Sequence, residues 1–268
     1  MQSDLLVIQS VLYRTIISPG FLLVMILAAG QTLLAAEIKP VAAPPPSSNK
    51  TVVIPKLQGP IKIDGELEEA VWREAAVLKP LHSTDGHTPE FEQTEIRLWY
   101  DEQALFLGWI CQDTNIQATL TNRDSHLWEE EAVEFFITPT KLNHYFEFQW
   151  NPIGAIFDAV ITNRLDEQNI SRGYRFDPNY NATNLISAVI LTGGSSDSHN
   201  RTKGWQVEAM IPFAELGRLV PKPKDVWRGN FFRINRDTNR AVQFSSWAPT
   251  YSPWFHQPNY FGNLEFGD

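Results

Sequence analysis

An aromatic ring and a carboxylate lie close together in residues 127–137 (Leu-Trp-Glu-Glu-Glu-Ala-Val-Glu-Phe-Phe-Ile), and another tryptophan, Trp254, lies near the C-terminus. Sugar recognition uses such groups, because a flat ring can lie under the C–H face of a pyranose while a carboxylate accepts hydrogen bonds from adjacent hydroxyls. Ionised acceptors make the stronger hydrogen bonds. Trp128, Glu134 and Trp254 are therefore candidate saccharide-binding residues. The alternative interpretation is a core tryptophan beside a solvated acidic loop.

The stretch that carries Glu134 has the alternation of a half-buried strand. Apolar side chains occupy every second position from Val133 to Ile137, and residues 145–150 repeat this pattern after the connection 138–144. If the two segments form a hairpin, one face carries the core residues Val133, Phe135, Ile137, Phe146, Phe148 and Trp150. The opposite face then carries Glu134, Tyr145, Glu147 and Gln149, provided that the register does not slip.

The composition favours a well-packed domain with an uncharged partner. Hydrophobic residues make up 43% of the chain, including nine Trp, sixteen Phe and seven Tyr, which is ample for a core. The formal net charge is −9, and removal of residues 1–36 takes away only Asp4 and Arg14, so it stays at −9. An acidic domain repels phosphate backbones, so we expect no nucleic-acid partner. A neutral ligand rich in hydroxyl groups, such as an oligo- or polysaccharide, meets no such repulsion.

The N-terminus has the features of a secretory signal peptide. Arg14 precedes the apolar run 16–29, and Leu-Ala-Ala at 34–36 offers a small-residue cleavage region. The run is short and contains a proline and a glycine, which argues against a membrane-spanning helix. We therefore expect a signal peptide over residues 1–36 and a secreted or periplasmic protein without stable membrane insertion after signal removal. An uncleaved anchor is the alternative.

The rest of the chain is predicted to be a proline-rich linker, residues 37–50, followed by one domain over residues 51–268. Short strand-like segments at regular spacing fill this domain, and one helix is predicted over residues 66–76. The predicted strands are 51–57, 94–100, 104–111, 132–137, 145–150, 155–162, 185–192, 204–211, 230–235 and 243–247. This pattern indicates an all-β fold, an antiparallel β-sandwich of jelly-roll or immunoglobulin type.

Several segments in the same order resemble the family 9 carbohydrate-binding modules and their DOMON-related secreted relatives. The segments are Ile-Asp-Gly-Glu-Leu-Glu-Glu-Ala-Val-Trp at 63–72, Leu-Trp-Tyr-Asp-Glu-Gln-Ala-Leu-Phe-Leu at 98–107, Trp-Glu-Glu-Glu-Ala-Val-Glu-Phe-Phe at 128–136, Lys-Gly-Trp-Gln-Val-Glu-Ala-Met-Ile-Pro at 203–212, Ser-Trp-Ala-Pro at 246–249 and Trp-Phe-His-Gln-Pro-Asn-Tyr-Phe-Gly-Asn-Leu at 254–264. Each is loose alone, but together they are fairly specific, and the resemblance covers residues 51–266.

The resemblance implies a binding site in which two tryptophans sandwich a terminal sugar and polar side chains hold its hydroxyls. Trp128 and Trp254 match the sandwich positions, and Glu134 matches the carboxylate. Gln149 stands where the family has an arginine. Tyr-Ser-Pro at 251–253 replaces the asparagine expected before the second tryptophan, so the sugar preference is left open. His256, beside Trp254, is a further candidate contact.

The resemblance implies a non-catalytic protein for polysaccharide recognition or catabolism. The alternative is a hydrolase acting on O-glycosyl compounds, since related modules are usually appended to such enzymes. Glycoside hydrolysis needs two carboxyl groups flanking the scissile bond, and the acidic residues of this chain show no pair with distinctive spacing, so no catalytic residue is predicted. A third class is a haem-binding electron-transfer domain, because some sandwich relatives ligate b-type haem through methionine. Met210 is the candidate, although a packing role is the simpler interpretation.

No cofactor is predicted, and the metal content is left open. Structural calcium occurs in the family, but the sequence has no acidic loop of calcium-binding spacing, so calcium stays a weak alternative. The single cysteine, Cys111, lies in an apolar run and cannot form an internal disulfide, which predicts a small buried side chain. The oligomeric state is left open.

Overall fold

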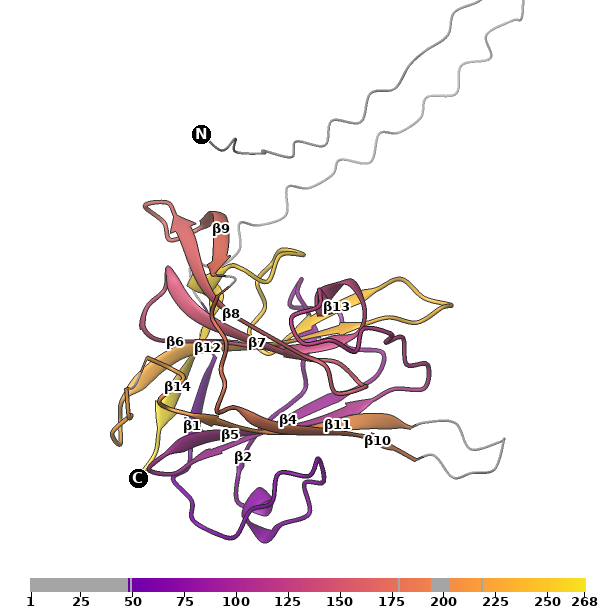
Figure 1. Ribbon diagram of the computed structural model, residues 1–268. Helices are drawn as coiled ribbons and strands as arrows, with labels where there is room; N and C mark the ends of the chain where they lie inside the picture. The colour runs from indigo at the N-terminus through magenta and orange to yellow at the C-terminus, as the bar shows by residue number, and fades with distance from the viewer. Residues whose placement is uncertain (1–47, 49, 178, 194–202, 218) are drawn as a thin grey trace, which may run out of the picture. The chain divides into compact units, whose positions relative to one another are not determined.

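The computed structural model describes residues 48, 50–177, 179–193, 203–217 and 219–268, and these form a sandwich of two β-sheets (Figure 1). The nine-stranded sheet contains β1 (Thr51–Ile54), β14 (Gly262–Phe266), β12 (Val226–Asn235), β6 (Ala132–Lys141), β7 (His144–Trp150), β8 (Ile156–Leu165) and β9 (Ser171–Asp177) in this order, while β13 (Gln243–Ser246) pairs with β12 and β3 (His82–Ser83) pairs with β13. The five-stranded sheet has the order β10 (Ile186–Thr192), β11 (Gly204–Pro212), β5 (Ala104–Gln112), β4 (Thr94–Tyr100) and β2 (Ala76–Leu78).

Almost all described strand pairs are antiparallel, and β1 runs parallel to β14. The predicted all-β sandwich is confirmed. The predicted signal peptide and most of the predicted linker lie outside the described residues. Within the part of the chain that the structure describes, no helix has the length and apolar character needed to span a bilayer.

The main core lies between the two sheets and is rich in aromatic side chains. Phe135 of β6 stacks on Phe231 of β12 with ring centroids 4.7 Å apart, and Trp109 of β5 meets Phe231 edge-on at 5.8 Å. These rings are fully buried, so the strand phase places every second side chain of β6 in the core. The side chains between them are forced onto the outer face of the nine-stranded sheet.

The β6–β7 hairpin has the predicted register. Val133 pairs with Trp150, Phe135 with Phe148, and Glu134 with Gln149. The predicted core face is buried, and Glu134, Tyr145, Glu147 and Gln149 share the outer face of the sheet. The β4–β5 hairpin also forms as predicted. Strand alternation therefore placed the candidate carboxylate on the correct face.

The predicted helix over residues 66–76 is wrong. The segment contains one 3₁₀ turn, η1 (Ala70–Arg73), and Ala76 already belongs to β2. Two tertiary contacts hold the segment instead. The Leu67 side chain packs directly on Gly108, where a Cβ atom would come within 2.1 Å of the leucine. The Trp72 indole N–H donates to Glu208 at 3.0 Å. Two other 3₁₀ turns are η2 (Leu127–Glu129) and η3 (Pro258–Tyr260).

Four described strands, β2, β3, β9 and β14, were not predicted from alternation. Strands β2 and β3 are too short to show a pattern, with three and two residues. Strand β9 carries charged and aromatic side chains that are mostly exposed, so it lacks the buried face that alternation detects. Hydrogen-bonded pairing with β8 forms this strand, although no apolar alternation in its own sequence predicts it.

A candidate saccharide-binding cavity

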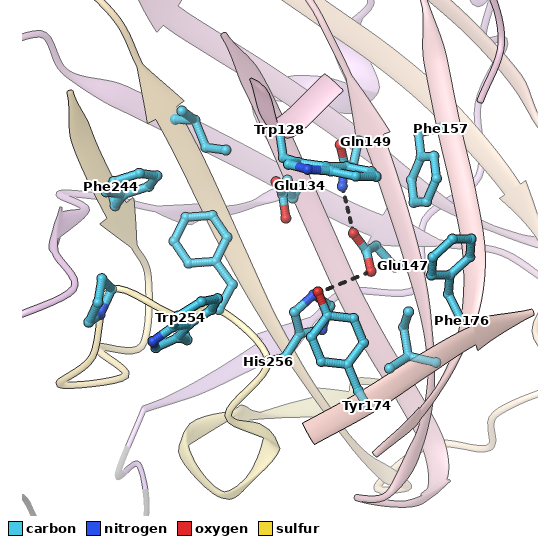
Figure 2. Close-up of a pocket in the computed structure, with 14 residues that line it drawn as sticks. Trp128, Glu134, Glu147, Gln149, Phe157, Tyr174, Phe176, Phe244, Trp254 and His256 are labelled. Atoms are coloured by element: carbon cyan, nitrogen blue, oxygen red, sulfur yellow. Dashed lines mark hydrogen bonds and ion pairs between the residues drawn. The ribbon is translucent and has the colours of Figure 1, made fainter. Parts of the chain in front are cut away.

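A cavity of about 420 Å³ lies on the outer face of the nine-stranded sheet (Figure 2). Strands β6, β7, β8, β9, β12 and β13, the η2 turn and the loop between β13 and β14 all contribute to it. Its lining consists of Trp128, Glu134, Glu147, Gln149, Phe157, Ile161, Tyr174, Phe176, Ile234, Phe244, Pro253, Trp254, Phe255 and His256. All five residues predicted for the site therefore line one cavity, although they come from segments far apart in the sequence.

Trp128 lies in the η2 turn just before β6, at the edge of the cavity. Its ring meets Phe157 of β8 edge-on at 5.1 Å and stacks on His126 with centroids 4.4 Å apart. The side chain is half-buried and packs against a small apolar cluster on this face of the sheet. One part of the ring therefore supports the cavity wall, and another part is open to a ligand.

Trp254 lies in the loop between β13 and β14 and is 67% exposed. A large exposed apolar ring at the rim of a cavity is unusual for a residue that only stabilises the fold. Its backbone N–H donates to the Ser252 hydroxyl at 3.1 Å, which helps to order the loop. The ring is thus available for contact with a ligand.

The alternative interpretation of residues 128–131, a core tryptophan beside a solvated acidic loop, holds only in part. Glu129 is exposed, but the carboxylate of Glu130 accepts hydrogen bonds from the backbone N–H groups of Thr119 and Leu120 at 2.5 and 3.0 Å. Glu131 is buried and accepts from the backbone N–H of Arg236 at 3.2 Å. The acidic loop is therefore tied down by its own carboxylates, and this fixes the position of the Trp128 turn.

The polar wall of the cavity comes from neighbouring strands β6 and β7. Glu134 pairs with Gln149 in register, and Glu147 lies two residues before Gln149 in β7, on the same face. The three side chains are buried, with Glu134 and Glu147 only 2% and 3% exposed. The Gln149 amide Nε2 donates to Glu147 Oε1 at 2.5 Å, and among the described residues Gln149 Oε1 has no hydrogen-bond partner. The wall therefore keeps hydrogen-bonding capacity that the protein itself does not use.

The two glutamates resist ionisation. Burial raises the pKa of Glu147 to about 8. The pKa of Glu134 is held well above its ordinary value, first by burial and then by the nearby charge of Glu147. Two carboxyl groups that share a dry site cannot both ionise easily. Near neutral pH this pair therefore keeps protons.

His256 forms the end of a buried hydrogen-bond chain below the glutamates. Asn163 Nδ2 donates to the Tyr145 hydroxyl at 3.3 Å, and this hydroxyl lies 2.8 Å from His256 Nδ1. The imidazole stacks on Tyr174 at 3.6 Å, and its burial lowers the pKa of His256 to about 3. His256 is thus neutral, and its Nε2 lies 3.9 Å from Glu147 Oε2, which is beyond hydrogen-bond range.

Sequence reasoning missed part of this site. Glu147 was placed on the correct face but was not singled out as a ligand contact. Tyr174 and Phe176 come from β9, the strand that alternation did not detect, and both are about half exposed at the rim. The period-two spacing of these two rings around Arg175 is the signal that could have revealed them.

Met210 lies away from the cavity. It is half-buried on the outer face of the five-stranded sheet and packs against the cluster that contains Trp72, Trp99 and Phe106. This environment supports the packing role. An absorption spectrum of the purified protein would test the haem alternative, since bound haem gives a strong Soret band.

Two other candidates can be placed. Cys111 is buried between the sheets, and burial raises the pKa of its thiol to about 12, so the thiolate form is scarce. Over the described ranges, no three His, Cys, Asp or Glu side chains come together as potential metal ligands.

The raised pKa of Glu147 predicts a pH-dependent stability. Between the ordinary pKa near 4.5 and about 8 the folded protein binds more protons than the unfolded chain, so the free energy of unfolding should fall as pH rises through this window. The slope reaches about 1.4 kcal/mol per pH unit for each proton. His256 acts in the opposite direction, but only between about pH 3 and its ordinary value of 6.5.

Urea denaturation between pH 6.5 and 8 measures this decline above the range of His256, although Glu131, whose pKa burial also raises to about 8, adds to it. We expect Glu147→Gln to flatten the decline relative to the unchanged protein, because the amide cannot lose a proton. Glu68→Gln, which removes an exposed carboxylate outside the cavity, should leave the decline as it is. An unchanged slope in Glu147→Gln would show that Glu147 titrates normally.

Comparisons with known proteins agree with this architecture. A candidate carbohydrate-binding protein from Bacteroides uniformis ATCC 8492 has a TM-score of 0.63 and 19% identity, covering 81% of this chain and 99% of that chain. A family 9 module from Caldicellulosiruptor kristjanssonii in complex with glucose has a TM-score of 0.57 and 15% identity, covering 82% and 97%. The module from the same organism in complex with cellotriose has a TM-score of 0.55 and 14% identity, covering 81% and 94%. At these identities the likeness shows a shared fold.

No curated protein matches the chain. The sequence model of carbohydrate-binding family 9 matches residues 77–266, which is well over half of the chain. The chain therefore belongs to carbohydrate-binding family 9.

Proposed function

We propose that the protein binds a saccharide in the cavity on the outer face of the nine-stranded sheet. Trp128 and Trp254 contact the faces of a sugar ring, and Glu134 and Gln149 form hydrogen bonds with its hydroxyls. The observation that carries this proposal is the exposed Trp254 ring at the rim of an aromatic cavity whose wall holds unused polar groups.

The size and chemistry of the cavity suit a small saccharide. Its volume of about 420 Å³ lies within the roughly 300–1,000 Å³ of small-molecule sites. Aromatic rings supply apolar area for the C–H faces of a sugar, and the few polar groups fix its orientation. The family 9 modules in complex with glucose and cellotriose make these two sugars the first ligands to test.

Trp254→Ala should weaken binding of glucose or cellotriose by about 1–3 kcal/mol, or roughly tenfold to a hundredfold, while the fold survives. The reason is that the ring is largely exposed and contributes little to the core. Isothermal titration calorimetry measures the affinity, and urea denaturation measures the fold. Leu191→Ala is the matched control, since Leu191 is an exposed apolar residue of β10, on the other sheet.

Trp128→Ala should weaken binding by a similar amount and also cost some stability, because its ring meets Phe157. Glu134→Gln keeps the shape and should cost less affinity than either tryptophan change. If both tryptophan variants unfold, the rings belong to the core and the proposed site is incorrect. Undiminished affinity in a folded Trp254→Ala variant would also exclude it.

We propose that binding occurs without hydrolysis. Glu134 and Glu147 are the acidic pair of the cavity, but they lie on adjacent strands of one wall. Glycoside hydrolysis places two carboxyl groups on either side of the scissile bond. Cellotriose recovered from the binding experiment should therefore be intact, and its conversion to shorter sugars would favour the hydrolase alternative.

We propose that the protein is exported, with residues 1–36 removed as a signal peptide and residues 37–50 acting as a linker to the domain over residues 51–268. The support is the charged start, the apolar run and the small residues before Glu37. N-terminal sequencing of protein from the periplasm or medium should give a start near Glu37. An intact N-terminus in the membrane fraction would indicate an anchor, and one on cytoplasmic protein would refute export.

A further inference from the structure

The cavity combines buried carboxyl groups with aromatic rings and has no cationic side chain in its lining. Its ionisable lining residues are Glu134, Glu147, Tyr174 and His256, and all its other described lining residues are apolar apart from Gln149. Arg236 is the arginine nearest the Trp128 turn in the hydrogen-bond network, but it donates to the Trp128 carbonyl oxygen at 3.3 Å instead of entering the cavity wall. The described lining of the cavity thus offers no positive charge to the glutamates.

Other buried acids of this protein do have donors. Glu208 accepts from the backbone N–H groups of Asp64 and Gly65 and from an indole N–H, at 2.9–3.0 Å. Asp113 pairs with Arg233 at 3.0 Å. In the described part of the chain the Glu134 carboxyl has no hydrogen-bond or ion-pair partner, although the residue is 2% exposed and lines the cavity (Figure 2). The carboxyl of Glu134 therefore faces the cavity with its hydrogen-bonding capacity unused by the protein, and a group of the ligand can fill it.

His256 cannot act as that partner. Its ring is neutral near physiological pH because burial lowers the pKa of His256 to about 3. Its Nδ1 is occupied by the Tyr145 hydroxyl, and its Nε2 stays 3.9 Å from Glu147. A positive charge beside the two glutamates would therefore come from the ligand.

We propose that the preferred ligand of this cavity is a sugar that carries a free amine, such as a hexosamine unit, with its ammonium group between Glu134 and Glu147. This inference rests on the proposed saccharide-binding function and names the class of sugar. An ammonium donates three hydrogen bonds, which suits the unpartnered carboxyl of Glu134 and the second oxygen of Glu147. Trp128 and Tyr174 add aromatic faces, which attract a cation.

The charge of the whole chain favours the same ligand. The formal net charge of −9 attracts cations and concentrates them near the surface. An ammonium between the glutamates also stabilises their ionised forms, so binding should drive protons from this pair into the buffer. A neutral sugar supplies no charge that would release these protons.

The test compares D-glucosamine, N-acetyl-D-glucosamine, D-glucose and choline by calorimetry at pH 6.5 and low salt. Glucosamine should bind about tenfold or more tightly than glucose and N-acetylglucosamine, because acetylation removes the charge and leaves the ring in place. In buffers of different ionisation enthalpy, the apparent binding enthalpy of glucosamine should vary and reveal proton release. The apparent enthalpy for glucose should stay constant.

Glu134→Gln and Glu147→Gln should each bring the affinity ratio of glucosamine to glucose close to one. The control is Glu68→Gln, which removes the same formal charge from an exposed site and should keep the ratio unchanged. Glucose binding without a preference for glucosamine would overturn this inference and leave the proposed function intact. Binding of none of the sugars would overturn both. Choline binding as tightly as glucosamine would overturn the assignment to an amino sugar, and a preference that survives in both glutamate variants would place the charge recognition elsewhere.

Discussion

Replacing Asp113 with alanine should lower the free energy of unfolding by about 3–5 kcal/mol, because it removes the only carboxylate that forms an ion pair with the buried Arg233 guanidinium among the described residues. The two side chains are each 1% exposed and lie 3.0 Å apart. Arg233 belongs to β12 of the nine-stranded sheet, and Asp113 follows β5 of the five-stranded sheet. The pair therefore ties the two sheets together, and urea denaturation should show the loss directly.

The control for this prediction is an exposed ion pair in the same protein. Lys56 and Glu102 lie 3.1 Å apart with 34% and 57% of their side chains exposed, so Lys56→Met should cost less than about 1 kcal/mol. The double variant Asp113→Leu with Arg233→Met removes both buried charges and should be more stable than Asp113→Ala. A small cost for Asp113→Ala would mean that Arg233 reaches water or another acid.

Replacing Glu208 with alanine should destabilise the fold by at least about 3 kcal/mol, since it leaves three N–H donors without their acceptor in a buried site. Glu208 Oε2 accepts from the backbone of Asp64 and Gly65, and Oε1 accepts from the Trp72 indole. These bonds fasten the 3₁₀ segment to the outer face of the five-stranded sheet. The measurement is again urea denaturation, with tryptophan fluorescence as the probe.

The variant Glu208→Gln removes the charge but keeps part of the hydrogen bonding, so it separates these two contributions to stability. Its amide oxygen can keep the two backbone donors, while its NH₂ group meets the Trp72 N–H, so the loss should be about half that of the alanine variant. Glu68→Ala lies in the same segment but is exposed, and its stability should stay within about 0.5 kcal/mol of the unchanged protein. Equal losses in the alanine and glutamine variants would show that the charge alone matters.

Asp113 and Glu208 show the environment that this fold gives to a buried carboxyl group with a purely structural role, and the cavity pair can be compared with them. Asp113 and Glu208 have partners at hydrogen-bond distance, and their removal should cost stability. Glu147 has one amide donor, and its replacement by glutamine should relieve a buried charge above neutral pH. The contrast supports a ligand-directed role for the cavity pair.

The sequence alone determined the fold class and the strand phase of the site. The alternation in β6 and β7 is a local property with a period of two residues, so it places Glu134 and Gln149 on one face whatever the rest of the chain does. The two tryptophans and His256 were also identified from their residue types and from the family resemblance, and all of them line the cavity. Their contact with a sugar stays a prediction.

Only the tertiary structure decided which groups face one another across the cavity. Strand β9 has no buried face of its own, and its pairing with β8 places Tyr174 at the rim. The segment before β2 does not form the predicted helix, because Glu208, more than a hundred residues later in the chain, accepts hydrogen bonds from its backbone N–H groups. Within the described residues Glu134 forms no ion pair, since Arg233 of the adjacent strand pairs with Val133 and points into the core towards Asp113. Periodicity in the sequence reports which face a side chain occupies, whereas its partners come from segments that only folding brings within reach.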